Sequence, residues 1–510
     1  MRSSSSSSSS MAASVSALLL LPLVQAALYD QVVDTAYGPV QGYAAFSSEP
    51  ANMTLPHWAD VTVWKGIPFG ADTAFANRFK YAQPVEPWNA TLEASAFGDS
   101  CLSSGTTYAN ISENCLNLNV WSPANSTRDR LPVVLWSYPA GGSNADPRFD
   151  GGGLAGKGVV FVNYNYRDGP TGFLVTPELS AERYAATGVN SSGNYAVLDQ
   201  VAALKWVRAN IGSFGGDPDR ITAMGQSAGS AATYHMLNGQ LTHGDLAGAI
   251  IQSGAYSAAW MASVGCSDVA CLRALPAATL DVAAQPGTTA VTFKESLDLY
   301  AIPETYADAL ARATANQVPV LTGNTRDESG ATFGLDMTLA AYLADLDSTY
   351  SGDYPARFLQ AYGANDSAAA AAAYNAQFTD RSKVGTALWA AAFAAGEGQH
   401  VFTYLWDHAP PGSSSGAAHE SEIQYTLANL YYKQYAWEAE DYAIAAVMSD
   451  YWVNFIKTGN PNGDGLHAWL SINENATVTQ ELGEAFGPIP IASPDQIALF
   501  TEWFASEPAL

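Results

Sequence analysis

A serine at the centre of a Gly-Gln-Ser-Ala-Gly pentapeptide, residues 225–229, constrains the fold of this chain more than any other feature. The pentapeptide stands between a largely apolar run at residues 220–224 and an alanine-rich stretch at residues 231–241. This order predicts a strand, a sharp turn with Ser227 at its apex, and a helix. Small residues are needed beside the serine, because the strand and the helix nearly touch at such a turn. The turn holds the hydroxyl beside the N–H groups of the helix start, a geometry that suits attack on an acyl carbon.

The same five-letter pattern occurs a second time at residues 412–416, around Ser414. That segment follows an Ala-Pro-Pro sequence and has neither a strand-like run before it nor a helix-forming stretch after it. Clusters of Pro, Ser and Gly are typical of loops, so we interpret the second match as a surface loop.

Apolar runs of strand length alternate with helical patterns from residue 116 onward. Residues 131–138 and 158–166 are strand-like, whereas residues 199–211 carry apolar side chains close to a 3.6-residue period and predict a helix. This alternation predicts an α/β fold in which helices cover both faces of a mostly parallel sheet. Because neither a repeat nor a linker divides residues 27–510, we expect them to form one domain.

The first 26 residues have the pattern of a secretory signal peptide. A serine tract precedes the apolar stretch at residues 17–24, and residues 24–26 resemble a small-residue cleavage site, with the cut after Ala26. This stretch is too short to span a bilayer, so we expect a secreted protein without a stable membrane anchor. Translation can start at Met1 or at Met11, and the sequence leaves that choice open.

Cysteine and sequon patterns agree with an oxidising, extracellular environment. The four cysteines form two close pairs, so we expect disulfides between Cys101 and Cys115 and between Cys266 and Cys271, although other pairings remain formally possible. N-x-S/T sequons mark candidate glycosylation sites in loops, some of which will be unused. The sequons are at Asn52, Asn89, Asn110, Asn125, Asn190, Asn365 and Asn475.

The chain is strongly acidic, with 48 Asp and Glu residues against 22 Lys and Arg residues and a formal net charge of −26. No basic run occurs in the sequence. Such a surface repels phosphate backbones and anionic lipid, which argues against nucleic acid as a partner. We interpret the charge as a means of solubility in mildly acidic surroundings.

A series of motifs along the chain carries a family likeness. The matching segments are residues 112–120, 163–167, 172–174, 193–195, 214–218 and 458–461. Together with the turn around Ser227, they resemble the type-B carboxylesterase and cholinesterase family of α/β-hydrolases over nearly the whole of residues 27–510. The resemblance implies an α/β-hydrolase fold with a large, mostly parallel central sheet and helices on both faces.

A serine hydroxyl needs a base and an orienting acid, which follow the serine in chain order in this fold. Chain order and spacing exclude His57, His235 and His243. His419 lies in residues 416–422, a small-residue segment that resembles the family's catalytic histidine segment. The other late histidines are interpreted as structural or surface groups: His400, His408 and His467.

The resemblance makes Glu328 the acid of the triad and Asp327 its structural neighbour. The apolar residues 318–323 run directly into residues 324–328, so the acid should stand just beyond the end of a strand. A solvated acidic turn is the alternative interpretation.

The resemblance also implies an oxyanion hole made of the Ala228 N–H and two N–H groups from an early loop. The family carries three glycines in that loop, whereas residues 136–142 read Trp-Ser-Tyr-Pro-Ala-Gly-Gly here. An ungapped count assigns the two donors to Ala140 and Gly141. A shift by one residue would assign them to Gly141 and Gly142.

A second departure is Gln226, where the family usually has Glu; the change removes a buried charge beside the serine and is expected to shift the pH profile. The loop closed by Cys101 and Cys115 is also shorter than in the family and has no tryptophan. We therefore expect an open site without a hydrophobic lid and without a preference for choline esters.

The resemblance implies a secreted serine hydrolase that cleaves carboxylic esters through an acyl-enzyme, with a small-molecule or lipid-like ester as substrate and with no metal or cofactor. Two alternatives stay open: acyl transfer to an acceptor other than water at the same site, and a non-catalytic, cholinesterase-like binding protein on the same fold. The sequence does not determine the ester, its acyl-chain length or the oligomeric state.

Overall fold

A computed structural model describes residues 27–506, apart from residues 103, 104, 106, 107, 254–294, 329, 397, 398 and 474. The expected signal peptide and the pair Cys266 and Cys271 lie outside the described residues.

The main sheet contains eleven described strands in the order β14-β13-β12-β11-β10-β9-β7-β8-β6-β4-β3. All neighbours from β13 to β8 in this order are parallel, and the pairs at both edges are antiparallel. A smaller sheet has the order β1-β2-β5. The strands are β1 (Val32–Asp34), β2 (Pro39–Gln41), β3 (Tyr43–Ala44), β4 (Thr62–Pro68), β5 (Leu92–Glu93), β6 (Asn117–Ser122), β7 (Leu131–Ser137), β8 (Val160–Tyr164), β9 (Gly216–Gln226), β10 (Gly248–Gln252), β11 (Val320–Thr325), β12 (Val401–Trp406), β13 (Val478–Leu482) and β14 (Phe486–Pro490).

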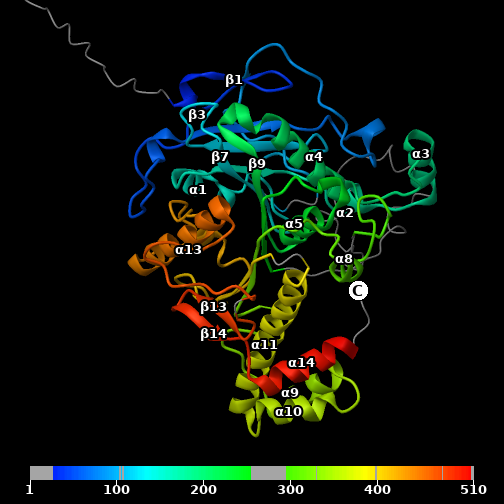
Figure 1. The fold of residues 1–510 in the computed structure, drawn as a ribbon, viewed down its shortest axis with the longest axis vertical. Helices are drawn as coiled ribbons and strands as arrows, with labels where there is room; N and C mark the ends of the chain where they lie inside the picture. The colour runs from blue at the N-terminus through cyan, green and yellow to red at the C-terminus, as the bar shows by residue number, and fades with distance from the viewer. Residues whose placement is uncertain are drawn as a thin grey trace, which may run out of the picture.

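Helices cover both faces of this sheet, with α1 and α13 on one side and α4 and α5 on the other (Figure 1). The predicted α/β architecture with a mostly parallel sheet is therefore confirmed. The helices are α1 (Gly152–Gly156), α2 (Gly169–Phe173), α3 (Pro177–Thr187), α4 (Tyr195–Asn210), α5 (Ala228–Asn238), α8 (Tyr306–Arg312), α9 (Leu339–Thr349), α10 (Tyr354–Tyr362), α11 (Ser367–Ala394), α12 (Ile423–Thr426), α13 (Ala439–Thr458) and α14 (Pro494–Ser506). Within the described ranges, every helix is too short or too polar to serve as a membrane span.

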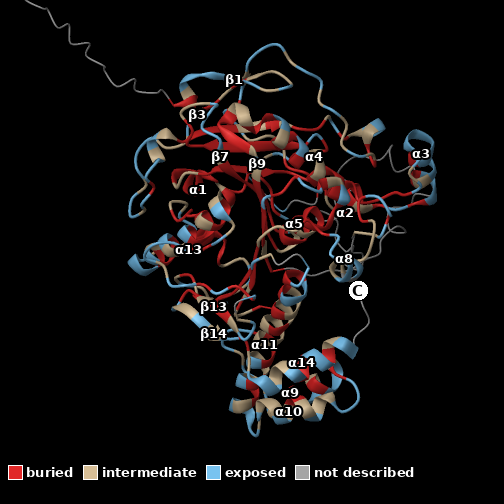
Figure 2. Cartoon of the chain, viewed as in Figure 1, coloured by how far each residue is buried: buried red, intermediate tan, exposed pale blue. Residues whose placement is uncertain are grey.

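The buried residues concentrate along the main sheet (Figure 2). The continuous apolar runs of β7 and β8 are buried over almost their whole length, as strands with both faces covered must be. A second buried cluster joins β11 and β12 to α9, α10, α11 and α14 and includes Tyr342, Phe358 and Trp503. The single domain over residues 27–510 stays a prediction.

Candidate active site

Ser227 stands alone between β9 and α5, with φ 56° and ψ −120°. Residues other than glycine rarely adopt a positive φ, and strained residues of this kind cluster at functional sites. The Ser227 N–H donates to the Gln252 carbonyl at 2.8 Å, and the Ser230 hydroxyl donates to the Ser227 carbonyl at 2.6 Å. These bonds fix the backbone of the turn. The predicted strand, turn and helix are therefore present around Ser227.

The two glycines that flank the turn are needed for a close approach between elements. A Cβ atom on Gly225 would lie 2.0 Å from the Gly229 carbonyl oxygen, and a Cβ on Gly229 would lie 1.9 Å from the Ser137 carbonyl oxygen. Both distances are far below van der Waals contact, so any larger residue would force β7, β9 and α5 apart. The structure therefore confirms the need for small residues beside the serine.

Glu328 and His419 form a short, direct contact, with 2.5 Å between Oε2 and Nδ1. The other carboxylate oxygen of Glu328 accepts hydrogen bonds from the Ser253 hydroxyl and the Thr325 N–H, each at 2.8 Å. Glu328 is buried, whereas His419 is exposed. A buried carboxylate held in this way can orient the imidazole and fix which ring nitrogen carries a proton. Asp327 instead forms a parallel β-bridge with Ala418, in the loop that carries His419.

The pKa of His419 is raised above its ordinary value. Partial burial acts to lower this pKa, but the hydrogen bond and the negative charge of Glu328 outweigh it, and the charges of Glu422 and Glu420 add to the rise. The site therefore stabilises the protonated imidazolium, as a group that accepts a proton from serine requires.

The contact between the serine turn and His419 is made by Gln226, the residue that precedes the serine. The Gln226 side-chain nitrogen lies 3.4 Å from Nε2 and 3.5 Å from Nδ1 of His419. Between the described atoms of Ser227 and His419 there is no direct hydrogen bond. Catalytic hydrogen bonds often tighten only when substrate binds. The structure thus joins Glu328 to His419 directly and sets His419 against the serine turn.

The early loop forms a tight turn over residues 139–142, in which the Gly142 N–H donates to the Pro139 carbonyl at 3.0 Å. Gly141 has a φ of 71°, a conformation that favours glycine. Ala140 and Gly141 are exposed, and their N–H groups have no acceptor among the described residues. Because the Gly142 N–H already donates within the turn, the geometry favours Ala140 and Gly141 over Gly142 as the predicted oxyanion-hole donors.

Ala228 is the first residue of α5, where helix N–H groups lack an acceptor within the helix. Its N–H group is therefore available beside Ser227. The carbonyl of Gly141 accepts the Gly105 N–H at 2.8 Å, so the loop closed by the disulfide supports the turn in which the other two oxyanion-hole donors are predicted. That disulfide, Cys101–Cys115, is formed as expected.

A further buried carboxyl, Glu422, lies behind the site. Burial, and secondly the charge of Glu328, raises the pKa of Glu422 to about 7. One of its oxygens accepts the Gln252 amide at 3.1 Å, but the other has no donor among the described residues. The side-chain oxygens of Gln252 and of its register neighbour Gln226 also lack a donor there. A protonated Glu422 would supply a donor, so the cluster favours the neutral acid.

Glu422 is three residues beyond His419, within the segment that carries the family likeness, but no sequence pattern marked it as buried. Gln226, at the position where the resemblance led us to expect Glu, adds no charge to this cluster. A carboxylate at position 226 would place another negative charge close to Glu422 and Glu328, and like charges in a buried site oppose ionisation.

Two cavities adjoin the site. A cavity of about 240 Å³ is lined by His419, Arg148 and Glu420, with polar side chains of residues 413–424 around them. A cavity of about 300 Å³ lies behind Ser253 and is bordered by Trp389. The first cavity is the more polar of the two.

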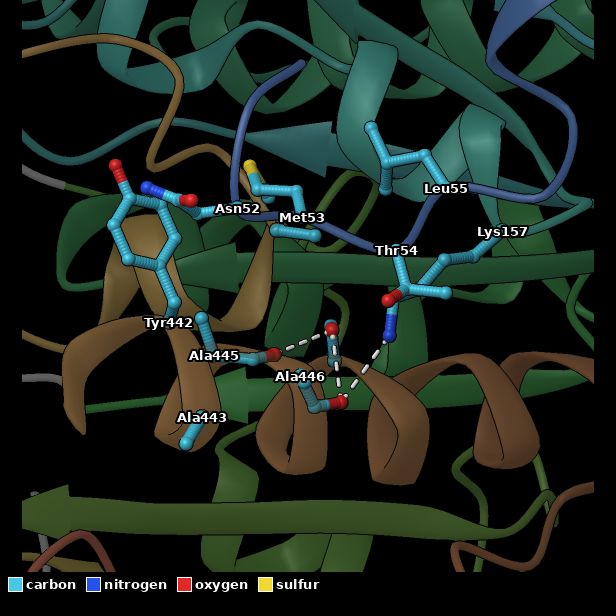
Figure 3. Close-up of a pocket in the computed structure, with 11 residues that line it drawn as sticks. Asn52, Met53, Thr54, Leu55, Lys157, Tyr442, Ala443, Ala445 and Ala446 are labelled. Carbon is cyan, nitrogen blue, oxygen red and sulfur yellow. Dashed lines mark hydrogen bonds between the residues drawn. The ribbon is translucent and has the colours of Figure 1, made fainter. Parts of the chain in front are cut away.

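A third pocket, of about 210 Å³, lies between residues 52–55 and α13 (Figure 3). Its lining is mixed, with Met53 and Leu55 from one side and alanines of α13 from the other, together with polar side chains of both segments. Lys157 at its edge forms an ion pair with Asp450 at 2.6 Å, so its ammonium group is already neutralised. None of the residues predicted for catalysis lines this pocket.

The sequons differ in how their asparagines are exposed. Asn125 and Asn475 are partly buried, and the side-chain oxygen of Asn125 is itself shielded from solvent. The asparagines that lie exposed are Asn52, Asn89, Asn110, Asn190 and Asn365. Glycosylation itself stays a prediction.

A large, mostly parallel sheet with a serine on a strand–turn–helix apex defines an α/β-hydrolase. The chain belongs to the carboxylesterase family, whose model matches residues 29–486, and it is a carboxylic-ester hydrolase.

Relatives with known names agree with this assignment. A fumonisin B1 esterase of Sphingopyxis macrogoltabida is 35% identical over 445 residues, which cover 80% of this chain and 81% of that protein. A para-nitrobenzyl esterase of Bacillus subtilis (strain 168) is 30% identical over 489 residues, with 88% and 94% covered. Carboxylesterase 4A of Bos taurus is 27% identical over 556 residues, with 91% and 94% covered.

Proposed function

We propose that this protein is a secreted serine esterase with the triad Ser227, His419 and Glu328, and that it hydrolyses its substrate through an acyl-enzyme. The observation that carries the proposal is the 2.5 Å contact between Glu328 and His419, set against the turn that presents the serine. An imidazole oriented by a buried carboxylate beside a serine is the arrangement that activates a hydroxyl nucleophile.

In the first half-reaction His419 accepts the Ser227 proton while the serine oxygen attacks the acyl carbon. The carbonyl oxygen becomes negatively charged, and the N–H groups of Ala140, Gly141 and Ala228 stabilise it. His419 then donates its proton to the leaving alcohol, and the acyl group remains bonded to Ser227.

In the second half-reaction a water molecule takes the place of the alcohol. His419 accepts a proton from the water, the resulting hydroxide adds to the acyl carbon, and the carboxylic acid leaves as Ser227 regains its proton. An alcohol acceptor in place of water would give acyl transfer by the same steps, so analysis of the products separates the two reactions.

The substrate is a small-molecule ester. The names of two relatives, fumonisin B1 esterase and para-nitrobenzyl esterase, support this class. The exposure of His419 and the polar cavity beside it favour an ester that reaches the site from solution.

We infer further that residues 1–26 are a cleaved signal peptide, that residues 27–510 are one catalytic domain, and that a subset of the seven sequons carries glycans. N-terminal sequencing of the secreted protein should begin at Ala27. Treatment of the secreted protein with an N-glycosidase should lower its mass.

The test of the triad is labelling with a fluorophosphonate followed by peptide mass spectrometry. We expect modification of Ser227 alone, together with complete loss of p-nitrophenyl acetate hydrolysis. Full labelling that leaves hydrolysis intact, or labelling of Ser414 in its place, would contradict the assignment.

A further inference from the structure

The residue that follows His419 has a backbone conformation that is unfavourable for any residue other than glycine. Glu420 has a φ of 71°, in the left-handed region that glycine favours. A non-glycine residue persists in this region only where its surroundings hold it. Because Glu420 is joined directly to His419, its backbone sets the direction in which the imidazole leaves the loop.

Arg148 holds the Glu420 side chain. Its Nη1 lies 2.9 Å from the Glu420 carboxylate, while its Nε and Nη2 donate to one oxygen of Asp146 at 3.0 and 2.9 Å. The Arg148 and Glu420 side chains are only 28% and 29% exposed. A partly buried pair in this geometry is less screened by solvent than a fully exposed one.

The backbone that carries Arg148 is fixed on both sides. Arg148 lies in the short helix η4 (Pro147–Phe149), which Asp146 caps by accepting the Arg148 N–H at 2.9 Å. The Asn429 amide donates to the Pro147 carbonyl at 2.7 Å and to the Arg148 carbonyl at 3.0 Å. The guanidinium therefore reaches the histidine loop from a firm base just beyond the turn at residues 139–142.

We propose that Arg148 is a positioning residue, whose ion pair with Glu420 holds the strained backbone after His419 and keeps the imidazole aligned with Ser227. This inference rests on the proposed function of His419 as the base. The competing explanation is that Glu420 acts only through its negative charge, which stabilises the imidazolium. The two explanations predict different results for a glycine at position 420, because glycine relieves the backbone strain without restoring the charge.

The decisive comparison is between Glu420→Ala and Glu420→Gly. Both variants lose the ion pair and the charge, but only glycine adopts the left-handed conformation freely. We expect Glu420→Ala to lower kcat by about 10-fold with little change in KM, and Glu420→Gly to recover most of that loss.

The role of Arg148 is tested by coupling. Arg148→Met should lower kcat by about 10-fold in the natural background but by less than about 2-fold when combined with Glu420→Gly, because the strain it opposes is then absent. Thermal unfolding of each variant separates loss of positioning from loss of fold.

Arg130 provides the matched control. Its guanidinium also pairs with two carboxylates, those of Asp217 at 2.6 Å and Asp219 at 3.2 Å. It precedes β7 at the end of the strand opposite to the turn at residues 139–142. Arg130→Met should leave kcat within about 2-fold of the natural protein.

Equal kcat values for Glu420→Ala and Glu420→Gly would overturn the positioning role and leave the charge as the explanation. An equal loss from Arg148→Met in both backgrounds would overturn it as well. If Arg148→Met does not fold, the comparison of alanine with glycine still decides.

Ser227→Ala, measured alongside, separates the two proposals. If it is inactive while the alanine and glycine variants are equal, only the positioning role fails. If it keeps full turnover, the proposed function fails and the positioning role fails with it.

Discussion

Asp327 and Ala417 exchange two hydrogen bonds: the Asp327 N–H donates to the Ala417 carbonyl at 3.0 Å, and the Ala417 N–H donates to the Asp327 carboxylate at 2.7 Å. The preceding Gly416 leaves no room for a Cβ atom, which would lie 2.3 Å from the same carboxylate. These contacts tie the loop that carries His419 to the end of β11. Two adjacent acids therefore have different tasks, since Asp327 holds the loop backbone and Glu328 contacts the ring.

Glu328→Gln should lower kcat by about 10²–10⁴-fold with KM nearly unchanged, because a neutral amide cannot stabilise the imidazolium. Asp327→Asn keeps an acceptor for the Ala417 N–H but loses the ion pair with Arg326, which is 3.1 Å long. It should therefore lower the free energy of unfolding by about 1 kcal/mol and change kcat little. Steady-state kinetics and denaturant unfolding measure the two effects. Equal, mild effects on kcat would rule out the proposed role of Glu328.

The two Gly-x-Ser-x-Gly segments provide an internal control. Ser227→Ala should lower kcat by about 10⁴-fold or more, whereas Ser414→Ala should leave it within a few-fold. Ser414 is exposed in the loop at residues 412–416, with no strand or helix around it. Turnover of p-nitrophenyl acetate by both folded variants tests this, and a comparable loss from Ser414→Ala would move the site.

The pH dependence of kcat/KM should report His419. Only the neutral imidazole accepts a proton, so activity should fall as the pH drops through the His419 pKa, which lies above its ordinary value. Glu328→Gln removes the interaction that contributes most to the rise, so the residual activity should have a lower midpoint. Profiles measured between about pH 5 and pH 9 give both midpoints. Coincident midpoints would show that the Glu328 carboxylate does not act on the ring.

The elements around the serine could be predicted to within a few residues. The apolar run at residues 220–224 lies inside β9, and the predicted helix at residues 231–241 overlaps α5, which starts earlier at Ala228. The helix predicted at residues 199–211 in fact begins earlier, at Tyr195. The pattern missed this start because the first turn is buried on every side and so shows no alternation of apolar and polar residues. Periodicity reveals half-buried helices well and fully buried turns poorly.

The interactions between distant charges could not be predicted. Arg148 and Glu420 are 272 positions apart, and in sequence each has the appearance of a solvated surface residue. Glu422 likewise stands among polar residues, yet the packing of its loop behind β10 removes it from water. Motifs indicated the proposed triad because its chemistry demands certain residue types, whereas these pairings depend on tertiary contacts.

Glu422→Gln should remove a pH-dependent loss of stability. The pKa of Glu422 is raised from 4.5 to about 7, so the folded state keeps a proton that the unfolded state has lost in that window. Stability from this group is therefore full below the unfolded pKa and falls as the pH rises through the folded one. At about pH 8 the variant should exceed the natural protein by up to about 3 kcal/mol, and at about pH 4 the two should be equal. Unfolding free energies at both pH values measure the difference, and a constant difference would show that Glu422 is ionised when folded.

The disulfide loop leads to a prediction about substrate access. Its cysteines are 14 positions apart, and its described residues lie against the site: Gly105 bonds to Gly141, and the Tyr108 hydroxyl lies 3.3 Å from that of Tyr432. So short a loop cannot both cover a gorge and present an apolar face to an oil surface. The rate of tributyrin hydrolysis should therefore show no upward jump at the solubility limit of the substrate and should level off there, because the concentration of dissolved ester no longer rises. Choline esters should have no advantage over neutral ones, because the loop has no tryptophan. A sharp upward break at the solubility limit would show that another segment acts as a lid and that the protein works at lipid surfaces.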